Sequence, residues 1–393
     1  MKRIVTIALF AACTLQLGAQ NSTTLEGVAR LLKGFISSQA STQEDTVSVR
    51  LLGRALDALA SGDIDGVLSQ AKEAAGLATP ASASEDLPSG TDRSFISAWN
   101  PQKFFLNLPA ANYSGITPVS VSGLEGDFLL IDDKSDTEGW RKVHISFDAS
   151  GQITAVRDDG FVAASTGATA TDGEGIAYNP HHGTVLMSRE ATNEILEFSP
   201  DGHATGRALK TARFFPSNGN AGLESLSCNN ATGEVWTMPE NSASGDLRLQ
   251  KYSPALWPSG HWTYRLDTPA VRSKGAIYVH GVSEICALED GTLLVLEREA
   301  NIPGTSVTEA AGAAVNCKLF RVDPSSVRRG ATLEKHLLTE FRSYALDLSF
   351  ANYEGMCLGP VLPDGRRVLV LIADSQKGYK GVLRDWMRTI LLF

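Results

Sequence analysis

Residues Gly173–Glu190 read GEGIAYNPHHGTVLMSRE, and the order of residue types in this stretch recurs along the chain. A glutamate precedes a short apolar run, a turn follows, and a second apolar run ends at another acid. The same order is found in GLESLSCNNATGEVWTMPE from Gly222, in VSEICALEDGTLLVLERE from Val282, and in NYEGMCLGPVLPDGRRVLVLIAD from Asn352. Because position, spacing and polarity recur together, the pattern indicates an internal repeat.

Each copy of the repeat carries an opening acid and a closing acid. The opening acids are separated by 50, 60 and 70 residues and are Glu174, Glu224, Glu284 and Glu354. The closing acids are Glu190, Glu240, Glu297 and Asp374. A degenerate copy, VSGLEGDFLLIDD from Val121, places Ser122 in the phase of the opening acid and ends at Asp132 or Asp133.

Repeats of this length, built from short β-branched and apolar runs between turns, predict the blades of an all-β propeller. We predict six blades, with five or seven as alternatives. The chain ends on the strand-like run RTILLF, residues 388–393. We expect this run to pair with a strand near residue 100 and so to close the ring.

The segments before the repeats have a different character. Residues 1–20 combine Lys2 and Arg3 with a short apolar run, which predicts an export signal; in a second interpretation Cys13 is a lipidated lipoprotein cysteine. Residues 21–80 carry apolar residues at helical spacing and predict a helical region, and residues 81–95 are expected to form a linker. The propeller should span residues 96–393, without a transmembrane segment after signal removal, in the periplasm or outside the cell.

Composition narrows the classes of function. The 393 residues include 35 basic and 44 acidic side chains, a net charge of −9, which disfavours nucleic acid as a partner. After signal removal four cysteines remain, with no CxxC spacing. An exported protein could pair them in disulfides, but their positions in short apolar runs favour small buried thiols.

The repeated acids predict a site at one mouth of the propeller channel, because the innermost strand of every blade ends there. Carboxylates that converge in this way repel one another unless a cation or a basic residue lies between them. Calcium, which takes six to eight oxygen ligands, suits such a group. We expect all eight repeated acids to be calcium ligands, the four opening acids also to be catalytic, and Arg189, Arg298 and His280 to bind substrate. The alternative is that the arginines only neutralise the acids, or that the acids only cap inner strands.

These motifs resemble the phytase-like β-propeller family, described as having esterase-like activity. The resemblance rests on the five repeat copies, taken in family order over about residues 100–393. It implies a propeller similar in outline to calcium-dependent propeller phytases, in which carboxylates at the channel mouth hold calcium and calcium holds phosphate. Ser225 after Glu224, and Ile285 after Glu284, depart from the glycine that the family often has there.

The resemblance and the acids together favour a metal-dependent hydrolase of an ester or phosphomonoester. The nucleophile elbow G-x-S-x-G and the zinc motif H-E-x-x-H do not occur in the sequence. The scarcity of clustered lysine and arginine makes phytate itself a poor substrate. The alternative function is a non-catalytic envelope propeller that binds a ligand or a protein, with its acids structural.

Overall fold

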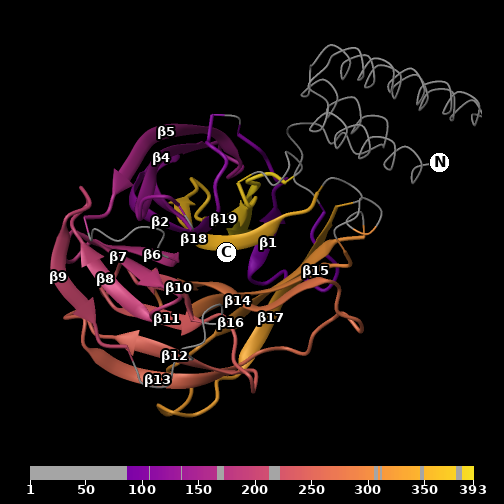
Figure 1. The fold of residues 1–393 in the computed structure, drawn as a ribbon. Helices are drawn as coiled ribbons and strands as arrows, with labels where there is room; N and C mark the ends of the chain where they lie inside the picture. The colour runs from indigo at the N-terminus through magenta and orange to yellow at the C-terminus, as the bar shows by residue number, and fades with distance from the viewer. Residues whose placement is uncertain are drawn as a thin grey trace, which may run out of the picture.

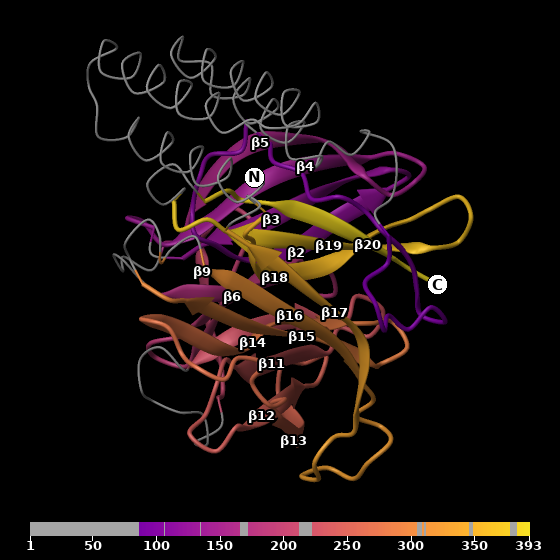
Figure 2. The ribbon, with the colours of Figure 1, turned by 90° about the vertical axis from the view of Figure 1, so that its right-hand side faces the viewer.

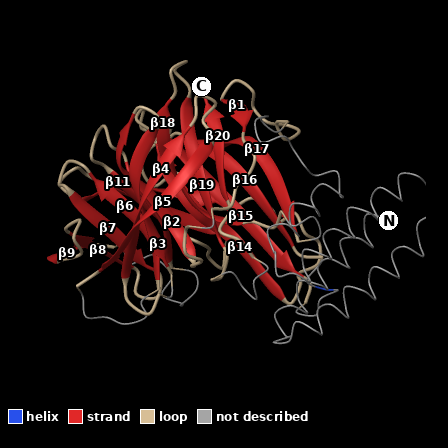
Figure 3. Ribbon diagram, turned by 90° about the horizontal axis from the view of Figure 1, so that it is seen from above, coloured by secondary structure: helices blue, strands red, loops and turns tan. Residues whose placement is uncertain are grey.

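The computed structural model describes residues 86–393 except 106, 134, 166–171, 212–221, 305–308, 310–311, 346–348 and 378–382. Strands and the loops between them make up nearly all of the described chain (Figure 3). The strands form five antiparallel sheets of four strands each. These sheets follow one another around a ring as the blades of a propeller, so that the first and last blades are neighbours (Figure 1).

The blades are numbered 1 to 5 by the order of their inner strands. The inner strands are β2 (Tyr113–Ser122), β6 (Gly173–Asn179), β10 (Leu223–Cys228), β14 (Ile277–Ala287) and β18 (Asn352–Val361). The second strands are β3 (Glu125–Asp132), β7 (Thr184–Arg189), β11 (Val235–Pro239), β15 (Leu293–Ile302) and β19 (Arg367–Asp374). The third strands are β4 (Gly139–Phe147), β8 (Glu194–Phe198), β12 (Asp246–Tyr252), β16 (Ala314–Val322) and β20 (Met387–Leu392). The outer strands are β5 (Ile153–Ala163), β9 (Ala204–Leu209), β13 (Pro258–Arg265), β17 (Lys335–Tyr344) and β1 (Ile96–Trp99).

The ring closes within blade 5, where the first described strand pairs with the last. β1 lies antiparallel to β20, with Ile96 opposite Leu392 and Trp99 opposite Ile390. The backbone N–H of Phe393 donates to the carbonyl of Phe95 at 3.0 Å and extends the pairing by one step. The predicted closure between the C-terminal run and a strand near residue 100 is therefore confirmed.

The prediction of six blades is wrong, because the structure has five. Before the inner strand of blade 1, the described residues form a single strand, β1, and this strand becomes the outer strand of blade 5 instead of starting a sixth sheet. The repeat count of five was thus already the blade count.

The second strands are buried along most of their length, because each is covered on both faces by neighbouring blades. In β19, seven consecutive residues from Val368 to Asp374 are buried, and β15 is buried from Leu293 to Ala300. Tight turns join inner and second strands; Gly291 and Gly365 have φ angles of +85° and +89°, which glycine adopts at little cost. Figure 2 shows the sheets stacked side by side.

The core lies between adjacent blades rather than in one central layer. Trp140 of blade 1 packs edge-on against Phe198 of blade 2, with ring centroids 5.7 Å apart. Trp99 of blade 5 packs in the same way against Phe341 of blade 4, at 4.6 Å. Each interface buries apolar side chains of two blades, so that the stability of one blade depends on both its neighbours.

The predictions for residues 1–80, including the export signal, Cys13 and the helical region, lie outside the described residues. Of the expected linker, residues 86–95 are described. The Asp92 N–H donates to the carbonyl of Leu338 in β17 at 2.7 Å, and the Thr91 and Thr339 hydroxyls lie 2.8 Å apart. This part of the segment therefore lies along the outer edge of blade 4.

The four described cysteines are free thiols: Cys228, Cys286, Cys317 and Cys357. All but Cys228, which is partly buried, are buried, which agrees with the interpretation of small apolar side chains. None of the described segments forms a helix with the length and apolar character that crossing a membrane requires.

The strand pairing in blade 5 predicts a large effect of Ile390, whose side chain is fully buried in β20. Replacing Ile390 by alanine should lower the free energy of unfolding by about 2–5 kcal/mol, because a cavity forms between β1 and β19. Denaturant unfolding followed by tryptophan fluorescence measures this change. Phe393→Ala, at an exposed side chain three residues away, is the matched control and should stay within about 0.5 kcal/mol. Equal effects of the two changes would contradict the closure.

Candidate functional site

A register shift near the start of each inner strand displaces residues from the regular pairing. The shifts fall between Tyr113 and Gly115, Gly173 and Ile176, Leu223 and Ser225, Val282 and Glu284, and Tyr353 and Gly355. Such a bulge turns the displaced side chain away from the alternation of the strand. The residues displaced in this way include Ser114, Glu174, Glu224, Ser283 and Glu354.

The ends of the second strands supply a second ring of side chains beside the bulges. In each blade, the last regular pair before the bulge joins one residue of the inner strand to one residue of the second strand. The next residue of the second strand belongs to this ring. In blade order they are Asp133, Glu190, Glu240, Arg298 and Asp374. Four blades thus carry an acid at this place, and blade 4 carries an arginine.

The two rings meet in a cavity of about 870 Å³ at one mouth of the channel. Seven carboxyl side chains line it: Asp133, Glu174, Glu190, Glu224, Glu240, Glu354 and Asp374. All seven are buried, with at most 8% of their surface exposed. Arg298, Lys274 and His280 are the basic side chains of its lining.

The cavity contains six of the eight acids that the sequence predicts as metal ligands, together with Arg298 and His280. Glu284, Glu297 and Arg189 lie outside it. Glu297 instead accepts hydrogen bonds from the Tyr264 hydroxyl at 2.7 Å and from Lys335 at 2.6 Å. Arg189 makes a two-fold ion pair with Glu138, with both N–O distances 2.6 Å.

In blade 4 the bulge displaces Ser283, so that Glu284 comes one residue after the position that Glu174, Glu224 and Glu354 occupy in their blades. Its Oε1 accepts the backbone N–H groups of Leu226, at 3.2 Å, and of Ile285, at 2.9 Å. The other blades have small residues at this position, which faces the neighbouring inner strand: Gly115, Gly175, Ser225 and Gly355. Burial raises the pKa of Glu284 well above its ordinary value. This glutamate contacts backbone between blades rather than the cavity.

In blade 1 the sequence interpretation also misplaced the ring position. Ser122 is exposed at the far end of β2, whereas Ser114 holds the bulge. The signal that could have found it is the motif Asn112–Gly115, NYSG, which matches NYEG at Asn352–Gly355. Of the two closing acids that the sequence left open, Asp133 lines the cavity.

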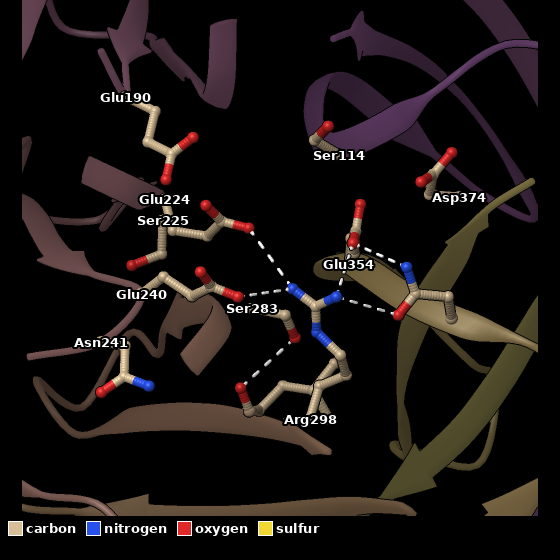
Figure 4. A network of polar contacts seen from close by, with 12 residues as sticks. Ser114, Glu190, Glu224, Ser225, Glu240, Asn241, Ser283, Arg298, Glu354 and Asp374 are labelled. Carbon is tan, nitrogen blue, oxygen red and sulfur yellow. Dashed lines mark hydrogen bonds and ion pairs between the residues drawn. The ribbon is translucent and has the colours of Figure 1, made fainter. Parts of the chain in front are cut away.

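Arg298 lies among carboxylates from the two blades that flank its own (Figure 4). Its Nη2 is 2.8 Å from Glu240 Oε1 and 3.7 Å from Glu224 Oε1, and its Nη1 is 3.0 Å from Glu354 Oε1. Nη1 also donates to Asn352 Oδ1 at 3.1 Å. Burial lowers the pKa of Arg298, but Glu354, Glu240 and Glu224 outweigh it, and the net shift is upward. The guanidinium is therefore charged.

On the other side of the mouth, carboxylates from blades 1 to 3 lie close together. One oxygen each of Glu174, Glu190 and Glu224 lie within 4.8 Å of one another. Oxygens of Asp133, Asp172 and Glu174 form a second group with the same spacing. Asp172 was not singled out from the sequence, although it lies two residues before Glu174.

Glu190, Glu224 and Asp374 have raised pKa values, because their charged forms are buried beside like charges. Burial, followed by Asp172 and Glu240, raises the pKa of Glu190 to about 8. Burial and Glu354 raise the pKa of Asp374 to about 8. Burial and the carboxylates of Glu174, Glu240 and Glu354 raise the pKa of Glu224 further, while Arg298 opposes the shift.

A cation would relieve this repulsion, and the donor set fits calcium, since every group of the two acid clusters offers a hard oxygen. Glu174 belongs to both clusters and links them. The residues that would hold such an ion are therefore Asp133, Asp172, Glu174, Glu190 and Glu224.

The rim of the cavity is formed by the start of β14 and the segment before it. Tyr278 donates its hydroxyl to Glu299 at 2.9 Å, and Lys274 lies over the Tyr278 ring at 4.6 Å. His280 follows two residues after Tyr278 in β14, and burial lowers its pKa. Ile277 is 48% exposed and gives this side of the mouth an apolar surface.

Comparison with known protein families gives a match over most of the propeller. The profile of a family described as "Phytase-like: Esterase-like activity of phytase" matches residues 109–376. No curated protein sequence matches the chain.

Solved structures similar to this chain are distant. A thermostable family-43 glycoside hydrolase is 11% identical over 74% of this chain and 92% of its own, with a TM-score of 0.42. A GH32 beta-fructofuranosidase from Bombyx mori is 8% identical over 74% of this chain and 62% of its own, also at 0.42. A member of the DUF4221 family from Bacteroides vulgatus is 9% identical over 76% of this chain and 97% of its own, at 0.36.

The raised pKa values predict how stability depends on pH without metal. Glu190 and Asp374 hold protons in the folded state up to a pKa of about 8, whereas the ordinary values are 4.5 and 3.8. Stability should therefore fall as pH rises from about 5 to about 8. Thermal unfolding in chelator measures this, and added calcium should raise the midpoint most at the alkaline end. A midpoint that rises over this range in chelator would contradict the assignment, and Glu190→Gln should flatten the profile.

Proposed function

Because the chain belongs to the phytase-like family with esterase-like activity of phytase, we propose that it is a calcium-dependent hydrolase of small esters or phosphomonoesters. Its active site is the acidic channel mouth. The observation that carries the proposal is a pair of carboxylate clusters that share Glu174, in each of which oxygens of three acids from two neighbouring blades lie within 4.8 Å of one another. Packing of the blades does not require these carboxylates to lie so close together, and their mutual repulsion destabilises the folded state, so that the arrangement favours a functional role.

The roles of the acids differ around the mouth. Glu174, Glu190 and Glu224, with Asp133 and Asp172, hold the cation. When bound, calcium supplies neutralising charge and polarises an oxygen of the substrate. Every other task falls to side chains of the chain itself.

Asp374 of blade 5 is the proposed general base. It lines the cavity outside both cation clusters, and the backbone N–H of Gln376 donates to its Oδ1 at 2.6 Å. A carboxyl with a pKa of about 8 accepts a proton readily near neutral pH, when part of it is ionised. In the proposed step Asp374 takes a proton from the attacking water as the new C–O or P–O bond forms and the ester bond to the alcohol breaks. Asp374 then gives this proton to the leaving alcohol oxygen, so that the neutral alcohol departs and the carboxylate is restored.

Arg298 serves charge balance rather than phosphate binding in this proposal. Both of its terminal nitrogens contact carboxylates of the protein, and Asn352 takes a further hydrogen bond. Lys274 and His280 on the rim are better placed to contact the substrate as it enters. With few basic groups, the mouth suits an ester with at most one phosphate.

The expected export of the chain fits this function, because calcium sites of extracellular modules bind weakly and depend on calcium-rich surroundings. We therefore keep a periplasmic or extracellular location as part of the proposal. A non-catalytic propeller that binds a ligand or an envelope protein is the alternative outcome of the experiment below.

Hydrolysis of 4-nitrophenyl acetate and 4-nitrophenyl phosphate, with calcium and with chelator, tests the proposal. Chelator should abolish turnover, and Glu174→Gln should lower kcat/KM by at least about 100-fold, because a charged ligand of the cation is lost. Glu284→Gln is the matched control: it changes a glutamate that is equally buried in an inner strand but lies outside the cavity. It should keep nearly full activity.

Calcium binding without turnover of either ester would contradict the enzyme proposal and support the ligand-binding alternative. Turnover that survives chelator, or that Glu284→Gln lowers as strongly as Glu174→Gln, would contradict the assignment of the site.

A further inference from the structure

Blade 4 departs from the other blades at both ring positions. Its bulge carries Ser283, and the position that holds Asp133, Glu190, Glu240 or Asp374 elsewhere holds Arg298. The guanidinium therefore replaces a negative charge by a positive one inside the ring. No other arginine among the described residues lines the cavity.

The terminal nitrogens of this guanidinium are surrounded by oxygen atoms of acids and an amide. Glu240, Glu354 and Asn352 contribute oxygens at 2.8, 3.0 and 3.1 Å from its terminal nitrogens, and Glu224 lies at 3.7 Å. Three carboxylates and an amide oxygen form the kind of set that a hard divalent ion takes. Asn352 also donates from Nδ2 to Glu354 Oε1 at 2.7 Å, which leaves its amide oxygen to accept from Arg298.

The remaining contacts of Arg298 suggest that its position is set by these acids. Its Nε is buried and has no hydrogen-bond partner among the described residues, so only the terminal nitrogens are engaged. Only 5% of the residue surface is exposed. A buried charge of this kind persists when opposite charges surround it closely, as the carboxylates of blades 3 and 5 do.

We propose that Arg298 takes the place of a second metal ion, so that the mouth binds one calcium, on the side of blades 1 to 3. The inference rests on the proposed function, since that function assigns the first ion to this side. Glu224 lies between the two halves: its oxygens belong to the cluster with Glu174 and Glu190 and also face Arg298. The arginine thereby completes the charge balance of the cluster without a second ion.

Removing the guanidinium should open a second cation site between Glu240, Glu354 and Asn352. We expect the full chain to bind one calcium, and Arg298→Gln to bind two, by isothermal titration calorimetry at neutral pH. Arg298→Lys keeps the charge and should bind one. Arg189→Gln, at a half-buried arginine whose ion pair lies outside the cavity, is the matched control and should also bind one.

A second measurement keeps the test decisive if Arg298→Gln does not fold without metal. Calcium should then restore its folding, because the second ion supplies the positive charge that the guanidinium provided, and the double change Arg298→Gln with Glu354→Gln, which also removes one ligand, should gain less from calcium. An Arg298→Gln chain that stays unfolded in calcium would overturn the inference. Thermal unfolding with and without calcium reports on folding for each variant.

The outcomes separate the inference from the function on which it rests. Two ions in the unchanged protein, or one in folded Arg298→Gln, would overturn the inference and leave the calcium site intact. No ion in the unchanged protein but one in Arg298→Gln would support the arginine as a substitute cation and overturn the proposed cofactor. No ion in either would overturn both.

Discussion

The β-bulge at the start of every inner strand is the constraint on which the site depends. In a regular strand, neighbouring side chains point to opposite faces of the sheet. Without a bulge, the alternation alone would decide which residue faces the mouth. The bulge displaces residues at the same step of all five blades, and the displaced glutamates of three blades, Glu174, Glu224 and Glu354, line the cavity. Residues as far apart in sequence as Ser114 and Glu354 become neighbours for this reason.

Packing between the blades stabilises the fold against the repulsion among the acids of the mouth. Buried carboxylates beside one another oppose folding at neutral pH. Apolar interfaces between all neighbouring blades, and the pairing of β1 with β20, hold the ring closed despite this repulsion. Arg298 reduces the repulsion on one side only, where it contacts Glu240 and Glu354. The asymmetry of the mouth thus follows from a single blade.

Most of the fold could be predicted from the repeat. The order of glutamate, apolar run, turn, apolar run and acid indicated blades, and the terminal run RTILLF indicated the closing strand. The number of blades could not be predicted in the same way, because a strand outside the repeats either starts a new sheet or completes an old one. Only the pairing of β1 with β20 decides between these.

The sequence by itself determined that acids recur at the ends of paired strands, and six of its eight predicted ligands line one cavity. What only the tertiary structure decided is which residue of each inner strand the bulge displaces. In blade 4 the displaced residue is Ser283, so that Glu284 is turned toward the neighbouring strand and Glu297 toward Tyr264. A shift of one residue reverses the face of a side chain, and the local composition is the same in either register.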